Sequence, residues 1–147
     1  MSGLSLNLML QLFGALFILM GLAGHLGIYK GWYWNSPNRI YGYVPIGLVF
    51  IISSFEAEIR AKLGQLGWLV VALYVVLFGL ALWGFVKAPK FIKPGWVRLI
   101  EAAPKRVYAV MVQDVKSGIN WRERVATPEA LAQWIKDAYR RPLKPSK

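Results

Sequence analysis

The chain has 147 residues, of which 56% are hydrophobic and 14% aromatic, with a mean hydropathy of +0.42 and a formal net charge of +11. This composition is too apolar for an ordinary soluble domain and is typical of an integral membrane protein. Because the sequence contains no cysteine, it excludes a disulfide framework, a thiolate zinc site, an iron–sulfur cluster and a cysteine nucleophile.

The first apolar segment predicts a membrane-spanning helix over residues 4–28. Leu4 to Leu26 contains no Asp, Glu, Lys or Arg, and as a helix it would extend about 34 Å, against a hydrocarbon core of roughly 30 Å. It is too long for a cleaved signal peptide and is expected to remain as an anchor. Polar and small residues share one stripe of this helix: Asn7, Gln11, Gly14, Gly21 and His25.

In hydrocarbon, small residues let helix backbones approach closely and polar side chains seek partners on other helices. The stripe is therefore expected to contact protein or a cofactor instead of lipid. Whether the contacting helices belong to this chain or to another subunit stays open.

His25 is the only histidine and the obvious candidate for a cofactor ligand. As an axial ligand, its imidazole would bind haem iron or the magnesium of a chlorophyll, with Gly21 and Gly24 leaving room for a flat ring. As a structural residue, it would hydrogen-bond a lipid headgroup, a backbone carbonyl or a neighbouring subunit. The second interpretation is favoured and no cofactor is expected, with chlorophyll or haem at His25 kept as the alternative.

A second span is predicted over residues 41–63, although its uncharged part, 43–55, has only 13 residues and would also suit a re-entrant element. Tyr41 can anchor one end at the interface. Two acid-first pairs at i,i+4 spacing favour continuation of the helix out of the membrane; they are Glu56 with Arg60 and Glu58 with Lys62. A third span, 66–86, carries no charge and no internal proline.

The cations predict how the chain is oriented. Of the 18 Lys and Arg residues, 14 follow Val86, where five acids leave a net charge of +9. By the positive-inside tendency this tail lies on the cytoplasmic or stromal side of a plasma, thylakoid or equivalent energy-converting membrane, with the N-terminus outside. Attraction to anionic lipid explains such a tail. A nucleic-acid partner is not expected, because acids interleave with the cations and no recognition motif is present.

The tail is predicted to contain three parts and a flexible basic end, 142–147. Residues 87–105 form an interfacial amphipathic segment around Trp96. Residues 106–141 form a β-hairpin, with the turn at Ser117–Gly118, followed by a helix from Pro128 to Arg141 that Thr127 caps.

A hairpin plus one helix is too small to fold unaided without metal or disulfide, so the tail is expected to dock on the membrane or on a partner. The docking candidates are Trp96, Trp121, Leu131, Trp134 and Ile135.

Taken together, the sequence predicts a mainly α integral membrane protein with three transmembrane helices and a cytoplasmic-side β-hairpin/helix tail. The expected role is a non-catalytic accessory, scaffold or assembly subunit of a larger membrane complex. Two alternatives stay open. One is a pigment- or haem-bearing subunit of a photosynthetic or respiratory complex that uses His25, and the other is a small transporter or channel. No catalytic residue and no metal site are predicted.

Overall fold

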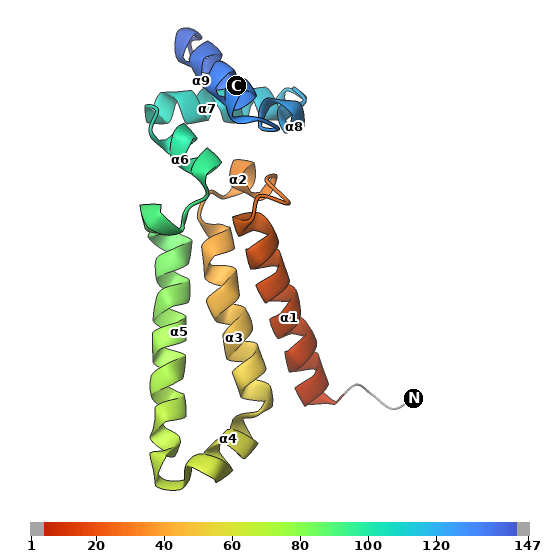
Figure 1. Cartoon of the computed structure of the whole chain (residues 1–147), viewed down its shortest axis with the longest axis vertical. Coiled ribbons are helices and arrows are strands. Elements are labelled where there is room, and N and C mark those ends of the chain that lie inside the picture. The colour runs from red at the N-terminus through yellow and green to blue at the C-terminus, as the bar shows by residue number, and fades with distance from the viewer. Residues whose placement is uncertain (1–4, 144–147) are drawn as a thin grey trace. The chain divides into compact units, whose positions relative to one another are not determined.

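The computed structural model describes residues 5–143, and every regular element within that range is a helix (Figure 1). The chain divides into two compact units, one ending at Pro89 and the other starting at Lys90. The elements of the first unit are α1 (Leu6–His25), α2 (Trp32–Asn35), η1 (Arg39–Gly42), α3 (Tyr43–Ser54), α4 (Glu56–Leu63), η2 (Gly64–Gly67) and α5 (Trp68–Lys87). Those of the second are η3 (Lys90–Ile92), α6 (Gly95–Glu101), α7 (Lys105–Lys116), α8 (Trp121–Arg124) and α9 (Pro128–Arg140).

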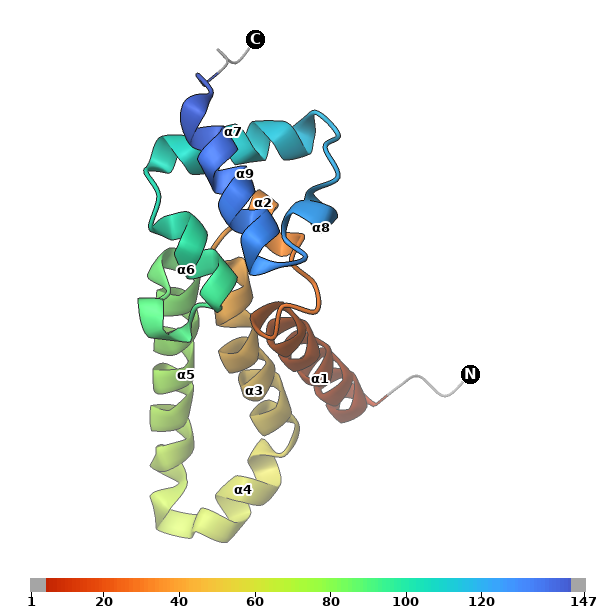
Figure 2. The same ribbon diagram turned by 45° about the horizontal axis from the view of Figure 1, so that its top comes forward.

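Three helices of the first unit lie side by side, with α3 between α1 and α5 (Figures 1 and 2). The chain ascends in α1, descends in α3 and ascends again in α5, so α1 and α5 run in the same direction. Their shared end contains the first connection and Lys87. The opposite end contains α4 and η2.

The prediction of three membrane spans is wrong, because only two of the described helical stretches are long and apolar enough to cross a bilayer. They are α1 and the stretch Glu56–Lys87 that ends in α5. Helix α3 has 12 residues, about 18 Å of rise, which falls short of the roughly 30 Å hydrocarbon core. At Phe55 the backbone leaves helical geometry, with φ −112° and ψ 8°, and this break divides the predicted 41–63 helix into α3 and α4.

Glycines allow α1 and α3 to approach at backbone contact. A Cβ added at Gly14 would lie 2.8 Å from the carbonyl oxygen of Gly47, and one added at Gly47 would lie 2.7 Å from the carbonyl oxygen of Gly14. On the other side of the bundle, a Cβ at Gly84 of α5 would meet the backbone of Tyr41 at 2.7 Å. These contacts are of the small-residue type that membrane helices use.

The second unit has its own apolar core. Helices α7 and α9 pack across each other, and α6 and α8 also contact α9 (Figure 2). Thr127 caps α9 by accepting a hydrogen bond from Ala130 N at 3.2 Å, and Pro128 occupies the first turn. This helix agrees with the one predicted from sequence to within one residue. Nearly inaccessible side chains fill the interior: Val107, Met111, Leu131, Trp134 and Ala138.

The prediction of a β-hairpin is also wrong, because residues 106–125 contain α7 and α8 and no strand occurs among residues 5–143. The buried residues of α7 are Val107, Val110, Met111 and Asp114, spaced three, one and three apart, which is the period of a helix face. Ser117 then caps the C-terminus of α7, and Gly118 adopts φ +89°, so the expected hairpin turn ends a helix instead. The predicted flexible end, 142–147, lies outside the described residues except for Pro142 and Leu143.

Candidate functional site

The most extensive surface feature of the first unit is its exposed apolar side chains. Along α1 they are Leu6, Leu8, Met9, Leu12, Phe13, Leu16, Leu19, Met20 and Leu22. Along α5 they are Trp68, Leu69, Val71, Leu73, Val75, Val76, Phe78, Leu80, Leu82, Trp83, Phe85 and Val86. Leaving this much apolar surface in water would cost on the order of 20 kcal/mol, taking these side chains as half-exposed. Monomeric soluble proteins rarely carry patches of this size.

Charge is distributed unequally between the two ends of this bundle. The end shared by α1 and α5 carries Lys30, Arg39 and Lys87, with no acid nearby in sequence. The opposite end carries two acids and two bases, all on α4, and Arg60 Nε binds Glu56 Oε1 there at 2.7 Å. One end is therefore cationic, and at the other, the balanced end, positive and negative charges are equal in number.

Polar side chains link the three elements at the balanced end. The Tyr74 hydroxyl on α5 donates to Glu56 Oε2 at 3.1 Å and lies 3.1 Å from Ser53 Oγ on α3. Ser54 donates back to the carbonyl of Ile51 at 2.7 Å, which is the backbone bond expected of a serine within a helix. These bonds fasten α3, α4 and α5 where the helix breaks.

The stripe predicted on α1 is only partly enclosed. Gly14 and Gly21 are buried against α3, where a Cβ on Gly21 would lie 2.7 Å from Val44 Cγ2. Gln11 is half-buried, and Asn7 and His25 are exposed near the two ends of the helix. The structure thus brings the glycines of the stripe into a contact within the chain and leaves its outermost polar side chains on the surface.

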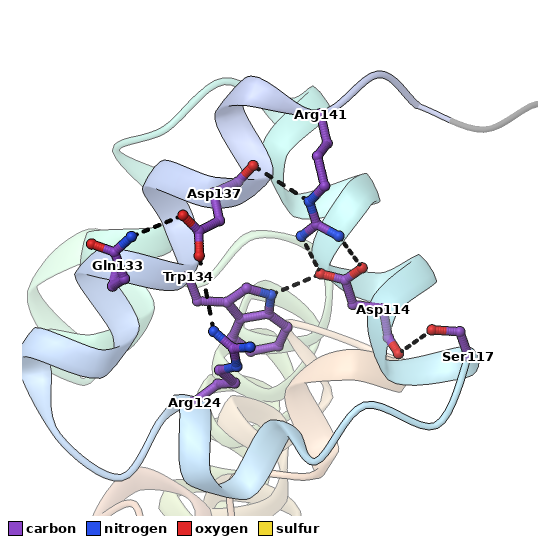
Figure 3. Close-up of polar contacts among 7 residues, drawn as sticks. All are labelled: Asp114, Ser117, Arg124, Gln133, Trp134, Asp137 and Arg141. Atoms are coloured by element: carbon purple, nitrogen blue, oxygen red, sulfur yellow. Dashed lines mark hydrogen bonds and ion pairs between the residues drawn. The ribbon is translucent and has the colours of Figure 1, made fainter.

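The second unit contains a buried polar centre that was not predicted from the sequence. Asp114 of α7 accepts a hydrogen bond from Trp134 Nε1 at 2.8 Å and two from Arg141, from Nη1 at 2.7 Å and Nη2 at 2.6 Å (Figure 3). Arg124 adds an ion pair with Asp137 at 3.9 Å beside it. The centre joins α7, α9 and the residue that follows α9.

Opposing effects set the pKa of Asp114. Burial raises it, but the hydrogen bonds from Arg141 and Trp134, together with the charges of Arg141 and Arg124, outweigh burial and hold the pKa below its usual value. The carboxylate is therefore ionised at neutral pH. One signal in the sequence could have revealed it: at helical spacing, Asp114 falls on the apolar face of Val107, Val110 and Met111, where an acid needs a partner.

The docking candidates in the tail have different environments. Leu131 and Trp134 belong to the core of the second unit, where each is 1% exposed, and they are not available to a partner. Trp96, Trp121 and Ile135 are half-buried, and the guanidinium of Arg122 lies 5.5 Å from the Trp121 ring centroid. The tail was expected to be too small to fold unaided. The core corrects that expectation, because helices α6 to α9 cover one another's apolar side chains.

Among residues 5–143, no group of three or more His, Asp or Glu side chains comes together in an arrangement that could hold a metal ion. No protein-family model, no curated protein and no solved structure matches the chain.

Proposed function

We propose that this protein is a non-catalytic accessory subunit of a membrane complex, which α1 and α5 anchor in the bilayer. The second unit would present a basic, helical surface on the cytoplasmic or stromal side. The observation that carries the proposal is the continuous apolar exposure of α1 and α5, because lipid or neighbouring membrane helices would cover surface that water would not tolerate.

The charge distribution supports the proposed orientation. Under the positive-inside tendency, the end with Lys30, Arg39 and Lys87 would lie on the cytoplasmic side, and the second unit follows directly from that end in the chain. Its cations would then face anionic lipid and acidic surfaces of neighbouring subunits.

Two faces are offered to a partner. Helix α1 uses its glycine face against α3 and leaves Phe13 and Leu16 exposed, as a subunit that packs beside other membrane helices would. In the second unit, exposed Lys136 and Arg140 lie on α9 outside the core. An acidic partner surface would complement these cations.

The membrane anchor is tested by carbonate extraction, and its orientation by labelling. Because the sequence has no cysteine, single-cysteine variants report accessibility without background. Gln65→Cys lies in η2 and Lys136→Cys lies on α9, and both positions are exposed. Because α1 and α5 run in the same direction, α3 and α4 together return the chain to the opposite end of the bundle between them (Figure 1). With a membrane-impermeant maleimide, we therefore expect Gln65→Cys to react from outside intact cells and Lys136→Cys only after lysis. Release of the chain by carbonate, or the reverse labelling, would contradict the proposal.

The subunit role is tested by purification in mild detergent followed by native mass spectrometry. We expect a stoichiometric partner to co-purify with the wild-type chain. A clean monomer at native expression level would argue against a subunit role. A visible absorbance spectrum of the same sample, compared with His25→Ala, tests the cofactor alternative: a band lost in the variant would favour it.

A further inference from the structure

A pocket of about 300 Å³ opens at the cationic end of the bundle, and all the residues that line it belong to the first unit. Its volume is at the lower limit of ligand pockets in proteins. Met20 and Ala23 come from the last turns of α1, and the rest come from the connection and the start of α3. Those residues are Tyr29, Trp32, Asn35, Ser36, Arg39, Ile40 and Tyr43.

The residues that line the pocket include a polar group and an apolar group. Arg39, Asn35 and Ser36 supply a guanidinium, an amide and a hydroxyl, which are hydrogen-bond donors suited to a phosphate. Met20 and Ala23 supply an apolar wall. A free anion would leave that wall unused, whereas a molecule with a charged head and an apolar chain would use both parts.

Arg39 supplies the only positive charge among the lining residues. Its side chain is exposed, and no acid among residues 5–143 forms an ion pair with it. The two acids of the first unit, Glu56 and Glu58, are on α4 at the other end of the bundle. The pocket is therefore complementary to an anion.

Aromatic residues mark the depth of the pocket in the proposed membrane. Tyr29, Trp32 and Tyr43 surround it, and Trp and Tyr concentrate where the hydrocarbon core meets the headgroups. Phosphates of phospholipids lie at that depth.

We propose that this pocket binds one anionic phospholipid. Its phosphate and headgroup would lie against Arg39, Asn35 and Ser36, and the first part of an acyl chain would lie against Met20 and Ala23. The inference rests on the proposed function, since it requires that the chain be embedded in a bilayer. It differs from a general attraction of the basic tail to lipid because it assigns one pocket and one arginine.

The test uses the full chain reconstituted in vesicles of phosphatidylcholine and phosphatidylglycerol at 4:1, extracted in mild detergent and examined by native mass spectrometry. We expect the wild type to retain one phosphatidylglycerol in preference to phosphatidylcholine. Arg39→Gln should lower that retention about 10-fold, because a charge-assisted hydrogen bond is lost. The matched control is Lys87→Gln, which removes a cation from the same end but outside the pocket and should retain the lipid like the wild type.

A second variant keeps the charge and fills the apolar wall. Ala23→Phe should lower retention of phosphatidylglycerol even though Arg39 is present, and it carries the test if Arg39→Gln does not fold. Equal retention by the wild type and both variants would overturn the inference. So would an equal loss in Lys87→Gln, which would show attraction to the general charge of that end.

Two further arms separate the remaining outcomes. Displacement of the lipid by 10 mM inorganic phosphate, at constant ionic strength, would identify a free-anion site and overturn the lipid assignment. Flotation of the vesicles before extraction reports whether the chain is embedded: failure to float refutes the membrane anchor itself, whereas normal flotation with no retained lipid refutes only the pocket.

Discussion

Asp114 offers the sharpest test of how the second unit is held together. Its replacement by alanine removes the acceptor that lies 2.8 Å from Trp134 Nε1 and both hydrogen bonds from Arg141. A buried donor that loses its acceptor costs about 1–3 kcal/mol. The pair with Arg141 adds less than about 1 kcal/mol, because that side chain is 43% exposed. We expect Asp114→Ala to lower the free energy of unfolding of this unit by about 1–4 kcal/mol, the sum of these two contributions.

A double-mutant cycle separates the two contributions. Arg141→Gln alone should cost less than about 1 kcal/mol, since Asp114 keeps the hydrogen bond from Trp134. In the Asp114→Ala background the same change should cost less than about 0.3 kcal/mol, because the carboxylate partner is already gone.

Amide hydrogen exchange of the full chain in mild detergent measures these costs locally, from peptides that cover α7 and α9. Peptides from α1 and α3 serve as an internal reference and should not change. Wild-type exchange of α9 in Asp114→Ala would refute the assigned role of the carboxylate. Simple addition of the two costs in the double variant would refute the coupling.

Three further predictions concern pH, helix packing and capping. Because the folded-state pKa of Asp114 is depressed, its contribution to stability is complete above the usual value of about 4 and is lost as the pH falls through the lower folded value. The urea midpoint of the second unit should therefore fall as the pH is lowered below about 4 in the wild type, but change less in Asp114→Asn. Gly14→Ala should destabilise the bundle by about 1–3 kcal/mol in thermal unfolding, since its Cβ would lie 2.8 Å from the carbonyl oxygen of Gly47. Gly79→Ala, where nothing lies within 4 Å, is the matched control and should be neutral or stabilising; equal effects of the two changes would contradict the contact. Thr127→Ala should cost the second unit about 1 kcal/mol through loss of the cap on Ala130 N, and Thr127→Ser should restore stability.

The apolar segments and the capped final helix could be predicted because each has a strong local signal. A run of about 20 uncharged residues fits a bilayer by length alone. For α9, Thr127, Pro128 and the apolar stripe agree with one another. Where several local preferences favour the same structure, tertiary contacts stabilise that structure and do not change it.

The prediction of a β-hairpin was wrong because it relied on the β propensity of the valines and not on the helical spacing of the apolar residues. Valine disfavours a helix by only a few tenths of a kcal/mol, whereas burial of one valine side chain contributes about 1.5–3 kcal/mol. In α7, Val107 and Val110 are buried together with Met111. Asp114 completes that face but is polar, so the stripe appears interrupted until its bond to Trp134 is known.

Neither the break within the predicted second span nor the pocket could be predicted from local sequence, and the reasons differ. The i,i+4 ion pair of Glu56 with Arg60 does form, but it stabilises α4 after the break at Phe55 and does not extend α3. The pocket collects residues from α1, the connection and α3, so it exists only once Gly14 and Gly21 have brought two helices together. No single element contains all the residues that line the pocket.

The reciprocal contact of Gly14 and Gly47 places the main chains of α1 and α3 against each other, with the side chains of Ile18 and Ile51 packed beside them. The crossing of the two helices is then set by backbone atoms and by these two isoleucines. Leu12, Phe13 and Leu16, on the outer face of α1, can therefore be exchanged for other apolar residues without shifting that crossing. Evolution is free to fit that face to a particular lipid or neighbouring helix while both glycines are retained.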